Sequence, residues 1–68
     1  MKINVNLIRT NEKKELDLDE NSVIIDLLEK INLKPDTVVV MRGKLPVPID
    51  EKLQKNETLN ILHISSSG

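Results

Sequence analysis

The feature that most restricts the fold of this chain is a single change in the spacing of its apolar residues. From Lys2 to Leu7 apolar and polar residues alternate, as in a strand with one buried face. After Asp19 the spacing changes, and the next apolar residues follow at helical intervals: Val23, Ile24, Leu27, Leu28 and Ile31. The chain has 68 residues, which is room for one domain only. One amphipathic helix must therefore share a core with the strands that precede and follow it.

The segments on either side of the helix are also predicted by the sequence. Residues 14–19 alternate leucine with charged residues after a polar turn, which predicts a second strand antiparallel to the first. Asn21 or Ser22 is expected to cap the helix, because their side-chain oxygens accept hydrogen bonds from the free N–H groups of a first turn. Pro35 disfavours a helical residue before it, so the helix is expected to end by about Leu33.

The second half of the chain predicts three further strands. Residues 38–41 are continuously apolar and mostly β-branched, which favours a central strand. Residues 45–49 contain two prolines, which cannot donate to a sheet ladder, so this segment is expected to be a short edge strand. Residues 50–55 are interpreted as a single helical turn around Leu53, and residues 58–64 as the last strand.

The resulting order of strand, strand, helix, strand, short strand and strand is that of the β-grasp fold. This is an α+β class with one main helix on a mixed four- to five-stranded sheet. Residues 1–64 are expected to form the domain and residues 65–68 a flexible tail. The core must be aliphatic, because the chain has 8 Ile, 10 Leu and 6 Val but no Phe, Tyr or Trp. Its predicted members are Ile3, Val5, Leu16, Leu27, Leu28, Ile31, Val39, Leu59 and Ile61.

One helix covers only one face of such a sheet, so the opposite face must be solvated or bind a partner. If Val39, Met41 and the alternating residues of the last strand face the core, their neighbours face outward. We therefore predict a partner-binding surface of Val38, Val40, Leu62 and Ile64. The alternative is that a bulge or residues 45–49 cover part of it.

The composition excludes several classes of site. The chain has no cysteine, which removes disulfides, thiolate metal sites and a cysteine nucleophile. Its net charge of −1 and its lack of aromatic residues argue against nucleic acid as a partner. His63 is the only histidine and has no neighbouring acidic residue, so a structural role is expected and no metal. No signal peptide or membrane span is evident, and we expect a cytoplasmic protein that is monomeric when free.

Four segments taken together resemble the ThiS/MoaD family of ubiquitin-like sulfur carriers, with the related archaeal small modifier proteins. They are Met1 to Asn6, Ser22 to Leu28, Thr37 to Val40 followed by Gly43-Lys44, and Leu59 to Ile64 running into a C-terminal glycine. The sequence departs from the family at the penultimate position, where Ser67 stands in place of the usual glycine.

The resemblance implies that Gly68 carries the reactive group, with Ser65, Ser66 and Ser67 as the tail that extends into another protein's active site. It implies a ThiF/MoeB-type activating enzyme that uses ATP, and a downstream sulfur-accepting synthase or target protein. No cofactor is expected on the chain itself. The resemblance implies a carrier rather than an enzyme. The length of the chain agrees with this, because a chain this short has little room for both a core and a deep substrate pocket. The product could be the thiazole of thiamin, molybdopterin or thiolated tRNA; the length and the Ile-Leu-His-Ile ending favour ThiS.

Two other functions remain open. A ubiquitin-like modifier would use the same activation at Gly68 and then form an isopeptide bond to a lysine of another protein. A plain interaction module would bind a partner through the sheet face and have an inert tail, which is consistent with Ser67 at the penultimate position.

Overall fold

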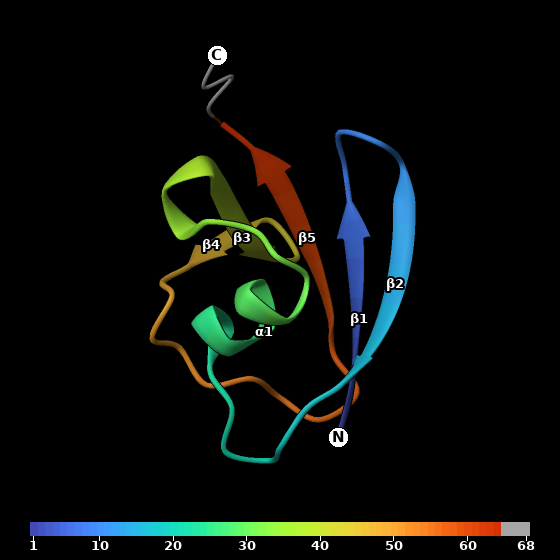
Figure 1. Ribbon diagram of the computed structural model, residues 1–68, viewed down its shortest axis with the longest axis vertical. Coiled ribbons are helices and arrows are strands. Elements are labelled where there is room, and N and C mark those ends of the chain that lie inside the picture. Colours follow the sequence, from blue (N-terminus) through green and yellow to red (C-terminus); the bar gives the residue numbers. More distant parts are fainter. Residues whose placement is uncertain (65–68) are drawn as a thin grey trace.

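The computed structural model describes residues 1–64 and has the predicted β-grasp architecture, with a helix packed on one face of a mixed sheet (Figure 1). The five strands lie in the order β2-β1-β5-β3-β4. β5 pairs parallel with β1 and antiparallel with β3, so β5 is the central strand and the prediction that β3 is central was wrong. The elements are β1 (Lys2–Leu7), β2 (Glu12–Asp17), α1 (Ile24–Lys30), the 3-10 helix η1 (Pro35–Thr37), β3 (Val38–Arg42), β4 (Leu45–Val47) and β5 (Thr58–His63).

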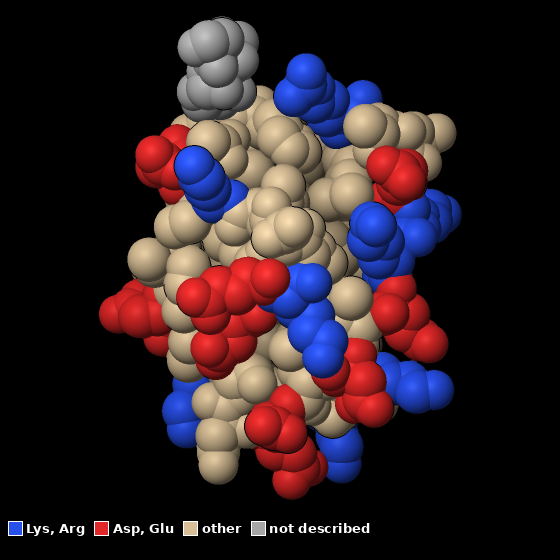
Figure 2. Space-filling model, in the orientation of Figure 1, with Lys and Arg blue, Asp and Glu red and all other residues tan. Residues whose placement is uncertain are grey.

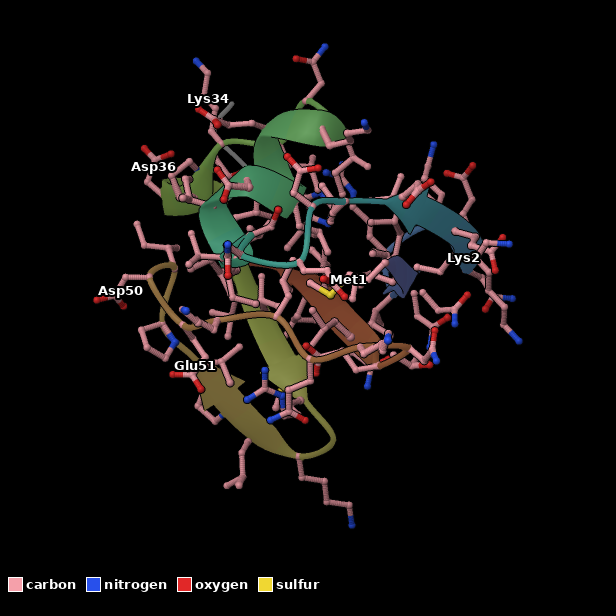
Figure 3. All side chains as sticks on the ribbon, turned by 90° about the horizontal axis from the view of Figure 1, so that it is seen from below. Met1, Lys2, Lys34, Asp36, Asp50 and Glu51 are labelled. Atoms are coloured by element: carbon pink, nitrogen blue, oxygen red, sulfur yellow. The ribbon has the colours of Figure 1, made fainter. Side chains whose placement is uncertain are left out.

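The core lies between α1 and the sheet and is entirely aliphatic. The predicted core residues of β1, α1 and β5 are buried, except that Ile31, just beyond the helix, packs half-buried at the edge together with Leu16 of β2. Met1 also packs against this core from below (Figure 3). Val39 is only half-buried, so its assignment to the core was wrong. The buried set is Ile3, Val5, Leu7, Ile24, Leu27, Leu28, Val38, Val40, Leu53, Leu59 and Ile61.

The start of α1 differs from the predicted cap. Val23, not Asn21 or Ser22, is the N-cap residue, and its N–H donates to Asp26 Oδ2 at 2.9 Å. The next two N–H groups, of Ile24 and Ile25, donate to carbonyl oxygens of Glu51 and Ile49 at 3.0 and 2.9 Å. The segment that crosses the helix start thus satisfies the free donors, so a side-chain cap is not needed.

That crossing segment replaces the helical turn expected at residues 50–55. Lys52 forms an isolated bridge with Val23, and the N–H of Leu53 donates to the Ser22 carbonyl at 3.0 Å. These bonds hold Leu53 in the core, where it is 6% exposed. The extended conformation at Lys52 and Leu53 is therefore fixed by contacts with the start of α1.

Three asparagines in the connections between elements have a φ in the left-handed region. Asn11 (φ 57°) lies in the turn between β1 and β2, and Asn56 (φ 61°) lies in the turn before β5. Asn32 (φ 65°) lies just beyond the C-cap residue Ile31, and the helix ends at Lys30, before the limit at about Leu33 that Pro35 predicts. Asparagine tolerates this conformation better than most residues with a side chain.

Arg42 at the end of β3 fastens the segment before β5 to the sheet. Its Nε donates to Glu57 Oε1 at 2.7 Å, and its Nη1 lies 3.3 Å from Glu51 Oε2. Glu57 Oε2 also accepts from the Gln54 N–H at 2.6 Å. The hydrogen bond that Arg42 donates to Glu57 raises the pKa of the Arg42 guanidinium above its usual value; burial opposes this effect and Glu51 adds to it. The guanidinium therefore stays charged.

Leu28→Ala should destabilise the domain by about 2 to 5 kcal/mol, because the leucine is fully buried and its removal leaves a cavity between α1 and the sheet. The measurement is the free energy of unfolding in urea. Ile25→Ala is the matched control on the half-buried side of the same helix, and it should cost less. A loss below about 0.5 kcal/mol for Leu28→Ala, well under the core range, would contradict this packing.

Candidate docking face and C-terminal activation site

The described residues end at Ile64, just beyond β5, and the predicted activation site at Gly68 lies four residues later in the sequence. The N–H of Ile64, the last described residue, donates to the Thr37 carbonyl at 2.9 Å, and Thr37 Oγ1 donates to the Lys34 carbonyl at 2.8 Å. These bonds hold Ile64, the residue from which the chain continues, beside η1 (Figure 1). The residues predicted to react and to form the tail, Gly68 with Ser65, Ser66 and Ser67, lie outside the described residues.

Two of the four residues predicted to bind a partner face the wrong way for that role. Val38 and Val40 are 6% and 3% exposed and belong to the core beneath α1. The reason is the register, in which Val40 lies opposite Ile61 of β5. Directly paired residues point to the same face of a sheet, so buried Ile61 carries Val40 to the helix side. The other two, Leu62 and Ile64, are 41% and 59% exposed as predicted.

The same register places a different apolar surface on the helix-free face. Val39 pairs with Leu62, and Met41 lies two residues further along β3 on the same face. The Ile8 N–H donates to the Ile61 carbonyl at 3.1 Å, which in a parallel ladder sets Ile8 beside Leu62. We call Ile8, Val39, Met41 and Leu62 the apolar patch. Ile8 is 51% exposed, so the patch is accessible as well as apolar.

Sequence reasoning missed three members of the apolar patch. Ile8 follows the last residue of β1, and only its pairing with β5 shows that it belongs to this face. Val39 and Met41 were placed inward, because the run of apolar residues in β3 has no alternation that would reveal its buried side. The burial of Val38 and Val40 is the observation that reverses the assignment.

The rest of the helix-free face is polar. Asn6 Nδ2 donates to Asn60 Oδ1 at 3.0 Å across β1 and β5. On β2, Lys13 and Glu15 alternate with residues on the helix side and are exposed. The apolar residues of this face thus lie on β3 and at the ends of β1 and β5, and the polar residues lie on β2 and earlier along β1 and β5.

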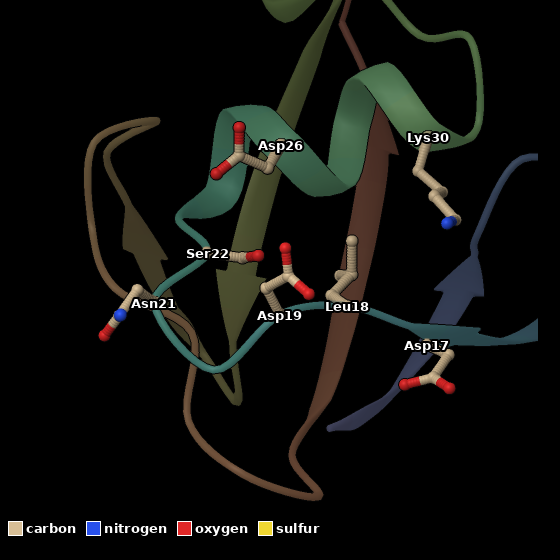
Figure 4. Close-up of a pocket in the computed structure, with 7 residues that line it drawn as sticks. All are labelled: Asp17, Leu18, Asp19, Asn21, Ser22, Asp26 and Lys30. Carbon is tan, nitrogen blue, oxygen red and sulfur yellow. The ribbon is translucent and has the colours of Figure 1, made fainter.

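The helix-side surface shows no concentration of charge of one sign. In Figure 2 acidic and basic side chains are interspersed over the face that is in view. A hollow between the β2–α1 connection and the helix carries carboxylates, but two of them are already bound: Asp26 by the Val23 N–H and Asp17 by the ammonium of Met1 (Figure 4). The residues that line it are Asp17, Leu18, Asp19, Asn21, Ser22, Asp26 and Lys30.

His63 pairs with Val38 and is half-buried on the helix side of β5. Among residues 1–64, its Nδ1 is buried and has no hydrogen-bond partner. Within the same residues, no group of three or more histidine or acidic side chains could hold a metal ion. The expectation of a structural histidine stays a prediction.

The described part of the chain contains no helix of sufficient length and apolar character to span a bilayer.

Comparisons of sequence and of structure find known proteins that are similar to this chain. A family model described as small archaeal modifier protein 2 matches residues 1–64. The sulfur carrier protein TtuB of Thermus thermophilus is 31% identical over 62 residues, which cover 91% of this chain and 95% of that protein. An uncharacterized protein of Archaeoglobus fulgidus is 29% identical over 58 residues, which cover 84% and 85%. The crystal structure of SAMP1 from Haloferax volcanii superposes over the whole of both chains with a TM-score of 0.75 at 15% identity, which supports the fold.

Proposed function

The chain belongs to the small archaeal modifier protein 2 family, within the ThiS/MoaD-like ubiquitin-like proteins, and on that premise we propose that it is a sulfur carrier activated at Gly68. In this proposal the chain is the substrate of an ATP-dependent activating enzyme and does not itself catalyse a reaction. It binds no cofactor, because the activating enzyme binds the ATP.

The observation that carries the proposal is the position of the apolar patch. Exposed Leu62 and half-buried Val39 lie opposite each other on the helix-free face. Leu62 is two residues before Ile64, from which the chain continues toward Gly68. An enzyme that takes hold of the chain end can cover this surface at the same time. Ile64, itself 59% exposed, would extend the contact toward the tail.

The chemistry requires only a carboxylate at the end of the chain. The carboxylate oxygen attacks the α-phosphate of ATP, and the bond to pyrophosphate breaks to leave an acyl-adenylate. A sulfide sulfur then attacks the acyl carbon, and the bond from that carbon to the AMP oxygen breaks. The products are a thiocarboxylate and AMP. Glycine at this position places no side chain beside the carbon that is attacked.

The second candidate is a protein modifier, which is favoured by the description of the family model that matches residues 1–64. Its chemistry differs only in the last step, where a lysine amine instead of sulfide attacks the acyl carbon. TtuB, in contrast, is described as a sulfur carrier, which favours the first candidate. Neither relative supports the preference for ThiS that the sequence suggested.

The test is the intact mass of the protein isolated from its own cells. A carrier should show a species heavier by about sixteen daltons, because sulfur replaces one oxygen of the terminal carboxyl. The same lysate, probed with an antibody against the chain, should show no ladder of larger species. A ladder that is lost when Gly68 is deleted, without the heavier free species, would favour the modifier.

A further inference from the structure

Beside the apolar patch, two asparagine side chains are joined across the neighbouring strands β1 and β5. Asn6 Nδ2 donates to Asn60 Oδ1 at 3.0 Å, and both residues are half-buried on the helix-free face. Asn60 is paired with Met41 of the apolar patch in the register of β3 and β5. Ile8 and Leu62 follow two residues further along the same two strands. We call Asn6 and Asn60 the amide pair.

The fold does not explain why amides stand at these two positions. Asparagine is depleted in strands, and β-branched residues fit a half-buried pleated surface better. A hydrogen bond between amides that water can reach adds little net stability, since each amide exchanges one partner for another. Asn4 of β1 and the charged residues of β2 also depart from strand preferences, so what distinguishes Asn6 and Asn60 is the hydrogen bond that joins them beside the apolar patch. A departure of this kind is expected where a surface binds something.

The amide pair presents a defined set of free hydrogen-bonding groups. An asparagine amide has two N–H donors and an oxygen with two acceptor sites. The bond between Asn6 and Asn60 leaves one donor and both acceptor sites on Asn6, and both donors and one acceptor site on Asn60. It also holds the two amides in one orientation, which lowers the entropy lost on binding. An uncharged set of alternating donors and acceptors matches peptide groups rather than an ion.

The amide pair lies close to the end of β5, so a protein that holds the end of the chain can also contact the pair. The four residues beyond Ile64 span at most about 14 Å when extended, so an enzyme that holds Gly68 must lie close to the end of β5. The apolar patch adjoins that end, and Asn60 lies two residues before Leu62 on the same strand and face. Protein interfaces combine an apolar centre with hydrogen-bonding groups around it.

We propose that the amide pair is a specificity-determining contact for the activating enzyme, which meets it with main-chain peptide groups or uncharged polar side chains. This rests on the proposed function, because it takes the activating enzyme as the occupant of the face. The apolar patch supplies contact area, and the amide pair selects the partner whose donors and acceptors match its own.

The test compares two double variants of the full chain. Asn6→Val with Asn60→Val removes the amide pair, and Asn4→Val with Thr58→Val makes equivalent changes at the neighbouring cross-strand pair, further from the apolar patch. Each is titrated in ATP–pyrophosphate exchange with each E1-like activating enzyme of the source organism. We expect the first variant to raise KM about 10-fold or more with kcat unchanged, as the loss of hydrogen bonds at an interface should. The second should leave both constants unchanged.

The thermal midpoint of every variant is measured alongside, and valine at the strand positions should keep or raise it. A wild-type chain that is activated, together with an unchanged KM for the first variant, would overturn the role of the amide pair and leave the proposed function intact. A wild-type chain that no enzyme activates would overturn both. A dimer of the wild-type chain that the first variant loses, with KM unaffected, would instead assign the pair to a contact between copies.

Discussion

Deletion of Gly68 should abolish ATP–pyrophosphate exchange by the cognate activating enzyme and leave the fold unchanged. In the proposed mechanism the carboxylate that attacks ATP belongs to this residue, and shortening the chain moves the new carboxylate back onto Ser67. The domain should not be affected, because its buried residues all lie between Ile3 and Ile61. The exchange rate and the circular dichroism melting curve are measured on the same preparation.

Ser67→Gly is the matched control for this deletion. It keeps the length of the chain and the carboxylate, and it removes only a Cβ and a hydroxyl beside the reacting residue. Exchange should be equal to that of the wild type or faster. Full exchange by the Gly68 deletion would be fatal to the proposed function, and absence of exchange by the wild type with every activating enzyme of the source organism would favour an interaction module with an inert tail.

The parts of the fold that the sequence predicts correctly are those with a clear hydrophobic period. Residues 2–7 alternate, and their buried residues are those expected. The helical spacing after Asp19 also identifies the buried side of α1 through Leu27 and Leu28. In both segments a polar residue stands wherever the chain faces water, so the phase of the pattern is visible.

The parts that were predicted wrongly depend on contacts between distant segments. β3 is apolar on both faces, and its phase is set by pairing with β5, about twenty residues later in the chain. The cap of α1 is supplied by carbonyl groups of Ile49 and Glu51, which no local signal near Asn21 or Ser22 could reveal. The error in β3 carries over to the candidate site, because the residues proposed to bind a partner are those that the pairing of β3 turns away from the helix.

Two substitutions at neighbouring positions of β3 should therefore have opposite consequences. Val40→Asp should unfold the domain, because Val40 is 3% exposed and a carboxylate there would have no partner. Burying an unpaired charge costs several kcal/mol, while a domain of this size has a total stability of only about 3 to 10 kcal/mol. Circular dichroism and the thermal midpoint measure the loss.

Val39→Asp should fold, since Val39 is half-buried on the helix-free face and its new carboxylate can reach water. It should weaken the affinity for the activating enzyme about 10-fold or more, because the charge would be desolvated in an apolar interface. Leu62→Asp, directly opposite on β5, should behave in the same way. If Val40→Asp folds and loses affinity while Val39→Asp unfolds, the assignment of faces is wrong. Val38 and Val40, and not Val39 and Met41, would then be the residues of β3 that face away from the helix.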